Sequence, residues 1–171
     1  MNGNRRRLLL TLFCLYLAVL TWIILFKTLP PAVILAERYP EPVLNLRPFD
    51  IDFSTTDLVR TQFREIRDNI LLFVPVGLYL GLLWPEKGWE RKLLFAFGVS
   101  FVCEAAQYTL RIGSADVTDL ITNSAGALLG LALYQLGTKL LGSRTEKVFT
   151  MGALACTFLL LGLMVLLLCL G

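Results

Sequence analysis

The sequence predicts an all-α protein, a polytopic membrane helix bundle of about five transmembrane helices. Of its 171 residues, 56% are hydrophobic and only 17% are charged, and the mean hydropathy is +0.69. A soluble domain of this length is normally less apolar. The hydrophobic residues also gather in runs that approach the roughly 20 residues needed to cross a bilayer. We therefore expect a single membrane domain over residues 1–171.

The first apolar run covers residues 8–26 and follows Arg5, Arg6 and Arg7. A secretory signal peptide also begins with basic residues, but its apolar core is usually about 7–15 residues long and precedes a small-residue cleavage site. This run is longer and leads into two prolines, and only a weak cleavage site ends at Ala36. We expect an uncleaved first span.

Later runs predict the remaining spans. These spans are expected at residues 69–84, 93–109, 120–137 and 148–170, with an outer loop at 27–68. The second span is short, but a helix that begins near Asp57 could continue into it, with Thr55, Thr56 or Asp57 as its N-cap. Pro75 should kink that helix, which is tolerated where neighbouring helices satisfy the freed carbonyl.

Glycines with GxxxG spacing occur in two of the predicted spans. They are Gly77 and Gly81 in the second span, and Gly126 and Gly130 in the fourth. Small residues at this spacing let helix backbones approach closely. We expect close packing within the bundle rather than contacts in a dimer.

Basic residues beside the runs indicate the orientation, because short cytoplasmic segments are enriched in Lys and Arg. The segments that we assign to the cytoplasm contain Arg5, Arg6, Arg7, Lys87, Arg91, Lys92, Lys139, Arg144 and Lys147. The other side has only Arg111 in its short connector, and residues 27–68 hold six basic and seven acidic residues. The N-terminus is therefore predicted to be cytoplasmic, in a multi-pass protein of the cell membrane.

Charge and residue content exclude several classes of function. The net charge of +3 is modest and its basic residues are scattered, so nucleic acid binding has no support. The chain has no histidine, which removes the usual proton shuttle near neutral pH and a common zinc ligand. Its four cysteines lie in apolar runs without a CxxC pair and are expected to be buried. We expect no cofactor and no metal.

Polar residues inside the apolar runs are the main functional signal. Glu104, Gln107 and Arg111 are spaced i, i+3, i+7, and Asp116, Asp119 and Asn123 repeat that spacing on the next helix. An ionisable group at membrane depth costs a few kcal/mol or more, so its default interpretation is functional. A short connector makes the two helices antiparallel neighbours. Their polar faces are therefore expected to confront each other in an outward-facing polar cleft.

A stripe of arginines is expected to border this cleft. Arg60, Arg64 and Arg67 are spaced i, i+4, i+7 on the helix that leads into the second span, and Asn69 follows them. Arginine suits phosphate or carboxylate groups, whereas the carboxylates of the cleft suit a cation or an amine.

Each of these polar groups also has a structural interpretation, which stays open here. The arginines could mark a helix at the lipid headgroup boundary. Glu104 and Arg111 could form an ion pair, and Asn123 could be a hydrogen-bonding strut between helices.

The stretch from Asn45 to Gly130 resembles the VanZ-like family of small bacterial membrane proteins, with a core at residues 45–137. The motifs that carry the resemblance are Asn45-Leu46-Arg47-Pro48-Phe49, Asn69-x-x-x-Phe73-x-Pro75-x-Gly77, Glu104-x-x-Gln107 with Arg111, and Asp116-x-x-Asp119-x-x-x-Asn123-x-x-Gly126-x-x-x-Gly130. The family is named for a protein associated with resistance to the glycopeptide teicoplanin in Gram-positive bacteria. The resemblance implies a cell-envelope protein that acts at or near cell-wall precursors, and it supplies no biochemical activity.

Three functions fit these residues. The favoured one is a non-catalytic factor that binds an amphiphilic ligand in the cleft. Its expected partners are membrane lipids, a lipid-linked wall precursor or a lipoglycopeptide, and a protein partner is left open. The second is an enzyme acting on a polyprenyl diphosphate, with Mg²⁺ held by Glu104, Asp116 and Asp119. The lack of histidine and of an obvious nucleophile counts against this enzyme. The third is a small proton-coupled transporter that uses Glu104, although no inverted repeat is present.

Overall fold

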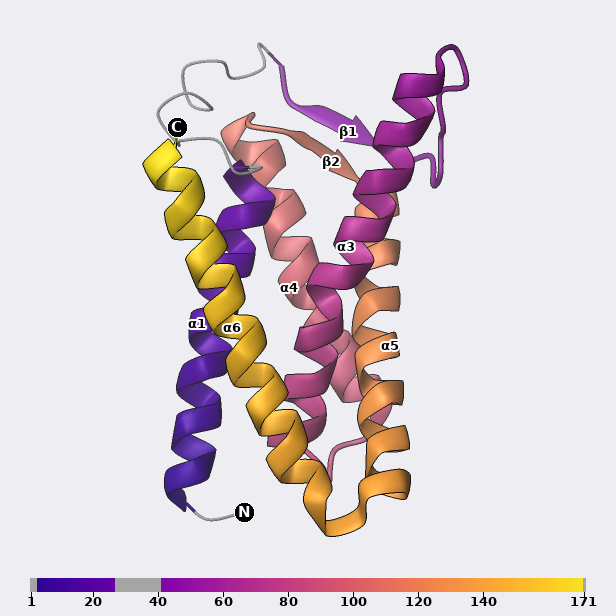
Figure 1. Ribbon diagram of the computed structural model, residues 1–171. Helices are drawn as coiled ribbons and strands as arrows, with labels where there is room; N and C mark the ends of the chain where they lie inside the picture. The colour runs from indigo at the N-terminus through magenta and orange to yellow at the C-terminus, as the bar shows by residue number, and fades with distance from the viewer. Residues whose placement is uncertain (1–2, 27–40, 171) are drawn as a thin grey trace.

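The computed structural model describes residues 3–26 and 41–170, and over these residues it is a helix bundle (Figure 1). The long helices are α1 (Gly3–Phe26), α3 (Thr56–Leu83), α4 (Trp89–Leu110), α5 (Val117–Leu141) and α6 (Thr145–Leu170). They run alternately up and down. We call the end with the two short strands the strand end, and the end where α1 starts and α5 meets α6 the opposite end. The predicted all-α bundle is confirmed.

Four helical stretches in the described residues are long and apolar enough to cross a membrane. They are Gly3–Phe26, Thr56–Leu83, Trp89–Leu110 and Val117–Leu166. The last stretch contains α5 and most of α6, between which the chain turns at the short 3-10 helix η1 (Gly142–Arg144) (Figure 1). The number of five spans and the cytoplasmic side of the N-terminus stay predictions. Residues 27–40, including Ala36 and its weak cleavage site, lie outside the described residues.

The second long helix, α3, begins within two residues of the predicted start. Thr55 is its N-cap and accepts a hydrogen bond at 3.2 Å from the backbone N–H three residues later. The helix continues through Pro75, which lacks the N–H that would bond to the Leu71 carbonyl. The adjacent carbonyl, of Leu72, accepts a hydrogen bond at 2.6 Å from the Tyr16 hydroxyl of α1. This bond ties α3 to α1 beside the proline.

The glycines with GxxxG spacing lie in the interface between α3 and α5. Gly77 and Gly81 belong to α3, and Gly126 and Gly130 belong to α5. A Cβ atom added at Gly126 would lie 3.0 Å from the Ile70 Cα and closer still to the Ile70 carbonyl oxygen. One added at Gly130 would lie 3.0 Å from the Gly77 Cα. These glycines are therefore close-packing positions within the bundle, as their spacing predicts.

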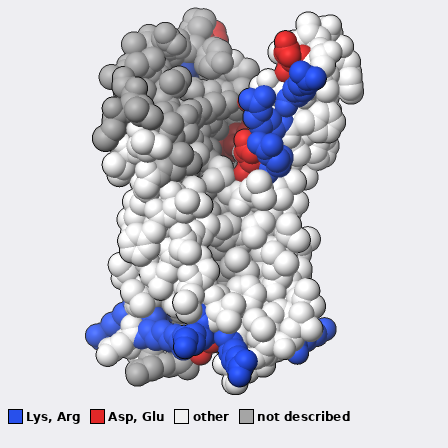
Figure 2. All heavy atoms as spheres, in the orientation of Figure 1, with Lys and Arg blue, Asp and Glu red and all other residues white. Residues whose placement is uncertain are grey.

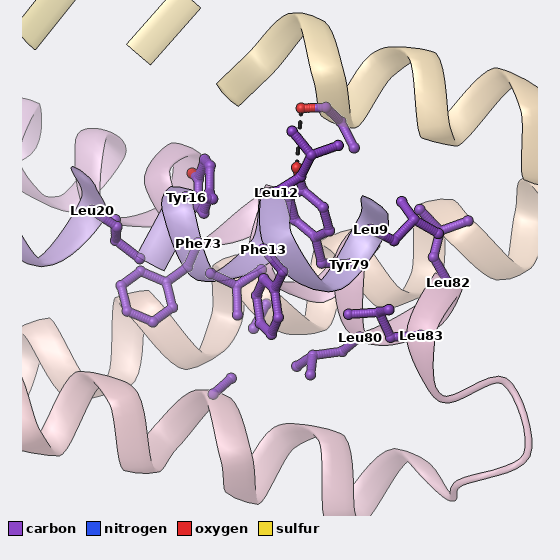
Figure 3. Packing of buried hydrophobic residues seen from close by; sticks show 14 of the residues in the cluster. Leu9, Leu12, Phe13, Tyr16, Leu20, Phe73, Tyr79, Leu80, Leu82 and Leu83 are labelled. Atoms are coloured by element: carbon purple, nitrogen blue, oxygen red, sulfur yellow. Dashed lines mark hydrogen bonds between the residues drawn. The ribbon is translucent and has the colours of Figure 1, made fainter. Parts of the chain in front are cut away.

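The hydrophobic core is formed mainly by α1 and α3, and α4, α5 and α6 contribute smaller parts of it (Figure 3). Its buried side chains include Leu9, Leu12, Phe13, Tyr16 and Leu20 of α1, and Phe73, Tyr79, Leu80, Leu82 and Leu83 of α3. The rings of Phe13 and Tyr79 stack with their centroids 5.1 Å apart. The Tyr79 hydroxyl donates to the Ala153 carbonyl of α6 at 3.2 Å and lies 2.7 Å from the Thr157 hydroxyl. One aromatic residue of α3 therefore bonds α3 to α6 while packing against α1.

A parallel pair of short strands closes the strand end, and the sequence analysis did not predict it. Strand β1 (Val43–Asn45) pairs with β2 (Ser114–Asp116), the connector between α4 and α5. Part of the predicted outer loop is thus bound to the first turn of α5. The pair positions the polar residues described below.

Charged side chains are distributed unevenly between the two ends (Figure 2). On the face shown, Lys and Arg form a band at the opposite end and a second group on α3 near the strand end. The up-and-down path places all three basic segments assigned to the cytoplasm at the opposite end (Figure 1). This arrangement agrees with the predicted topology, in which those segments share one side of the membrane.

Candidate functional site

Asp116 is the centre of the polar residues at the strand end. It is the N-cap of α5, where its Oδ1 accepts a hydrogen bond from the Thr118 N–H at 2.7 Å. Its Oδ2 accepts from the Asn45 side-chain amide of β1 at 2.9 Å. Its own N–H donates to Oε2 of Glu104 on α4 at 2.9 Å. One residue thus joins β1, α4 and α5.

Glu104 and Gln107 are buried on the inner face of α4, with exposed fractions of 4% and 3%. The Gln107 Nε2 donates to the Ile24 carbonyl of α1 at 3.2 Å. The Gln107 Oε1 is buried and accepts no hydrogen bond from any residue that the structure describes. A buried carbonyl oxygen without a donor is costly, by about 1–3 kcal/mol, so this atom is a candidate ligand contact.

Asn123 lies deeper in the bundle and is almost fully buried. Its Nδ2 donates to the hydroxyl of Ser100 on α4 at 2.8 Å, which fits the strut interpretation of this residue. Such bonds between helices typically contribute about 0.6 kcal/mol. The Asn123 Oδ1 is also buried and accepts no hydrogen bond within the described part of the chain.

Asp119 contacts α3, whereas the sequence analysis expected it to face α4. Its Oδ1 accepts a hydrogen bond at 2.7 Å from the side-chain amide of Asn69. The predicted polar residues therefore lie on two sides of α5. Glu104 and Asp116 meet on the side of α4, and Asn69 and Asp119 meet on the side of α3.

Arginines at the strand end are exposed. Arg67 forms an ion pair with Asp68, with Nη2 and Oδ1 2.7 Å apart, and Arg60 lies 3.9 Å from Asp57. Exposed pairs of this kind contribute about 0–1 kcal/mol. Arg64 is exposed on the same helix, and Arg111 is exposed at the end of α4, where it adopts a left-handed φ of 58°. The α3 arginines thus form a basic surface rather than part of the buried network.

Cavities on either side of the first turn of α5 adjoin these residues. The lateral cavity, of about 300 Å³, is lined mainly by Leu44, Leu46, Phe101, Tyr108 and Leu120, with Glu104 and Asp116 as its charged members. The acidic cavity, of about 180 Å³, is lined by Ile23, Ile24, Leu72, the carboxylates Glu65, Asp68 and Asp119, and the amides Asn69 and Gln107. Figure 2 shows acidic side chains recessed beside the basic group on α3.

The described residues contain no group of three or more His, Cys, Asp or Glu side chains that could hold a metal ion. Mg²⁺ bound by Glu104, Asp116 and Asp119 was one of the alternatives that the sequence left open. The structure instead directs Asp116 toward Asn45 and Asp119 toward Asn69.

Several residues that build the site were not predicted from the sequence. Asn45 was noted as part of a motif but was not predicted to bond to Asp116. The Phe49 N–H donates to the Thr118 hydroxyl at 3.0 Å, so the same motif contacts α5 at a second point. Ser100 lies four residues before Glu104 on the same helical face, and this spacing was the one signal that could have identified it.

The outer segment is also anchored to α3. The Asp52 N–H donates to Oε1 of Gln62 at 2.8 Å, and the Gln62 amide donates to the Asp50 carbonyl at 3.2 Å. At the turn before α3, the Ser54 N–H donates to Asp52 and lowers the pKa of that carboxyl. These bonds hold residues 50–52 against the N-terminal part of α3.

Comparison with known proteins gives two matches over the same region. The profile of the VanZ/LLP1 family matches residues 13–138, which include every candidate site residue. Protein VanZ of Enterococcus faecium is 38% identical over 128 residues, which are 75% of this chain and 74% of that protein. No solved structure matches the chain.

Proposed function

The chain belongs to the VanZ/LLP1 family, and from that premise we propose that it is a multi-pass protein of the cell membrane that binds an amphiphilic ligand at the strand end. The candidate ligands are a lipid-linked wall precursor, an anionic membrane lipid and a lipoglycopeptide. Binding of this kind would influence susceptibility to teicoplanin, the compound to which the family resemblance points.

The lateral cavity carries this proposal. Its walls are almost entirely apolar side chains, yet it also contains the carboxylate-bearing residues Glu104 and Asp116. An apolar cavity with a few convergent polar groups is typical of a small-molecule site. An alkyl or prenyl chain would occupy the apolar part, while the head group would reach the polar residues around the start of α5.

The exposed basic surface supports an anionic component in the head group. Arg60, Arg64 and Arg67 lie on one stretch of α3 at the strand end, and Arg111 lies at the end of α4. Guanidinium groups bind phosphate and carboxylate through paired hydrogen bonds. We assign them the first contact with the ligand, before its head group enters the site.

Native mass spectrometry of the detergent-purified protein tests the proposal by identifying lipids that co-purify with it. We expect the wild type to retain a diphosphate-bearing or anionic lipid, and Arg111→Ala and Asp119→Ala to lose it. Arg91→Ala, which removes an exposed arginine at the opposite end, is the matched control and should retain the lipid. Equal lipid content in all four proteins would refute the proposal.

A phenotypic assay gives a second test. In a host where expression of the wild type alters teicoplanin susceptibility, Asp119→Ala and Glu104→Gln should abolish the effect while the proteins still insert into the membrane. Full activity of Glu104→Gln would rule out the lateral cavity as the functional site, and full activity of Asp119→Ala would rule out the side of α5 that faces α3.

A further inference from the structure

We propose that the acidic cavity binds a primary ammonium group carried by the ligand. The inference rests on the proposed amphiphile site, because it specifies the head group that would enter it. The cavity lies between the C-terminal ends of α1 and α4, the middle of α3 and the first turn of α5, on the other side of α5 from the lateral cavity.

The charge of the lining favours a cation. Every charged side chain that the structure places along the cavity wall is acidic, namely Glu65, Asp68 and Asp119. Asp68 already binds Arg67, and Asp119 accepts a hydrogen bond from Asn69. A positively charged group in the cavity would gain from the carboxylates together, in a site shielded by the apolar side chains of Ile24 and Leu72.

Gln107 gives independent support for a ligand that donates a hydrogen bond, because its side-chain oxygen has no donor among the described residues. Its side chain is 97% buried, lines the cavity, and is held in place by the bond from Nε2 to the Ile24 carbonyl. That bond leaves the side-chain oxygen as a fixed acceptor, and no described residue donates to it. A ligand with an N–H group would satisfy this atom.

The arrangement suits an ammonium group better than a metal ion. The acceptors are distributed over three helices, and none of the described carboxylates form a group tight enough to hold a metal. A primary ammonium has three N–H donors that point in different directions, so it can bridge acceptors that a metal ion could not coordinate together. The cavity volume of about 180 Å³ also leaves room for the carbon chain that carries the nitrogen.

The lining also distinguishes a primary from a quaternary ammonium. Trimethylammonium groups are recognised mainly by the faces of aromatic rings. The residues that line this cavity in the structure include no aromatic side chain, and its polar members are three carboxylates and two amides, whose oxygens accept hydrogen bonds from N–H donors. A trimethylammonium group has no such donor and would leave the Gln107 oxygen without a hydrogen bond.

A matched pair of amphiphiles tests the inference. Dodecylamine and dodecyltrimethylammonium have the same charge and the same chain, and differ in their N–H donors. Binding to the purified protein would be measured by native mass spectrometry and by competition. We expect dodecylamine to bind at least about tenfold more tightly than the trimethyl compound, since a hydrogen bond to a charged group is worth that factor or more.

Substitutions in the cavity test whether its residues cause the preference for dodecylamine over dodecyltrimethylammonium. Gln107→Leu and Asp119→Asn should each remove most of the tenfold preference. Glu86→Gln neutralises an exposed carboxylate at the opposite end and should leave it intact. Because Gln107→Leu could disturb the bundle, Gln107→Glu is a second variant, and it should increase the preference for dodecylamine, since a carboxylate accepts a stronger hydrogen bond from the N–H groups that the trimethyl compound lacks.

The source of the amine is determined with two further probes. Phosphatidylethanolamine in nanodiscs tests a lipid head group, and the soluble dipeptide Gly-Lys tests an amine on a peptide. Selective binding of either supports the ammonium site and identifies its source.

The result that would overturn the inference is equal binding of dodecylamine and dodecyltrimethylammonium by the wild type. Phosphatidylglycerol, an anionic lipid, is measured in the same samples. Retention of phosphatidylglycerol without an amine preference would refute the ammonium site and leave the proposed function standing. Absence of every amphiphile from the wild type would refute the proposed function as well.

Discussion

Replacing Gly126 with alanine should separate α3 from α5 and lower the stability of the bundle. The added Cβ would lie 3.0 Å from the Ile70 Cα and closer to the Ile70 carbonyl oxygen, and both are backbone atoms that cannot rotate away. Ordinary contact begins near 3.4 Å, so the helices must move apart by at least about 0.4 Å at this point. Overpacking of this kind costs about 1–3 kcal/mol.

The matched control for this substitution is Gly98→Ala on α4, where an added Cβ would meet no atom within 4 Å. Alanine favours a helix over glycine by about 1 kcal/mol, so this control should be neutral or slightly stabilising. Both variants gain the same helix propensity, so they should differ by the overpacking cost alone, about 1–3 kcal/mol in the free energy of unfolding. Denaturation in mixed micelles, followed by tryptophan fluorescence, measures the difference.

The same substitution connects the helix interface to the site. Ile70 follows Asn69, whose amide donates to Asp119 at 2.7 Å, so separation at Gly126 should lengthen that bond. Ligand retention by Gly126→Ala should fall together with its stability. Equal stability of Gly126→Ala and Gly98→Ala would refute the packing argument.

Two other substitutions test single contacts. Asp116→Ala removes the N-cap of α5 and the bond to β1, so it should destabilise the bundle by about 1 kcal/mol and speed hydrogen exchange at residues 43–45. Its control, Asp116→Asn, should keep most of the cap. Unchanged hydrogen exchange in the alanine variant would contradict the role of Asp116. Tyr79→Phe removes the hydroxyl bonds to α6 and should lower the free energy of unfolding by about 1 kcal/mol, measured by thermal denaturation. Tyr108→Phe, at a partly exposed position, is the control and should have little effect. Equal stability of the two variants would show that the Tyr79 bonds contribute nothing.

Hydropathy and capping chemistry predicted the helices well, because these signals are local. The apolar run at residues 8–26 became part of α1, and the threonine and aspartate cluster before the second span contains the N-cap of α3. The apolar runs understated helix length, since α3 extends from Thr56 through the polar residues before its span. A helix that leaves the apolar region keeps its backbone hydrogen bonds although its hydropathy falls.

The contacts of the candidate site were harder to predict. Helical spacing placed Asp119 and Glu104 on neighbouring helices, but it gave no information about a third helix, and Asp119 bonds to Asn69 of α3. Gln107 donates to the backbone carbonyl of Ile24. Every residue has such a carbonyl, so residue type could not identify this acceptor. The strands β1 and β2 contain three residues each, too few for an alternating pattern to be visible.

The bond between Asn45 and Asp116 joins residues that are 71 positions apart, and this separation has a consequence for synthesis. At about 5–20 residues per second, roughly 4–14 s pass between translation of the first residue and translation of its partner. During that interval residues 43–45 lack β2, the strand with which they pair, so their backbone groups are available for pairing with another chain. Completion of the strand end therefore depends on how quickly the ribosome delivers α4 and its connector, and slow codons in that stretch should lower the yield of folded protein.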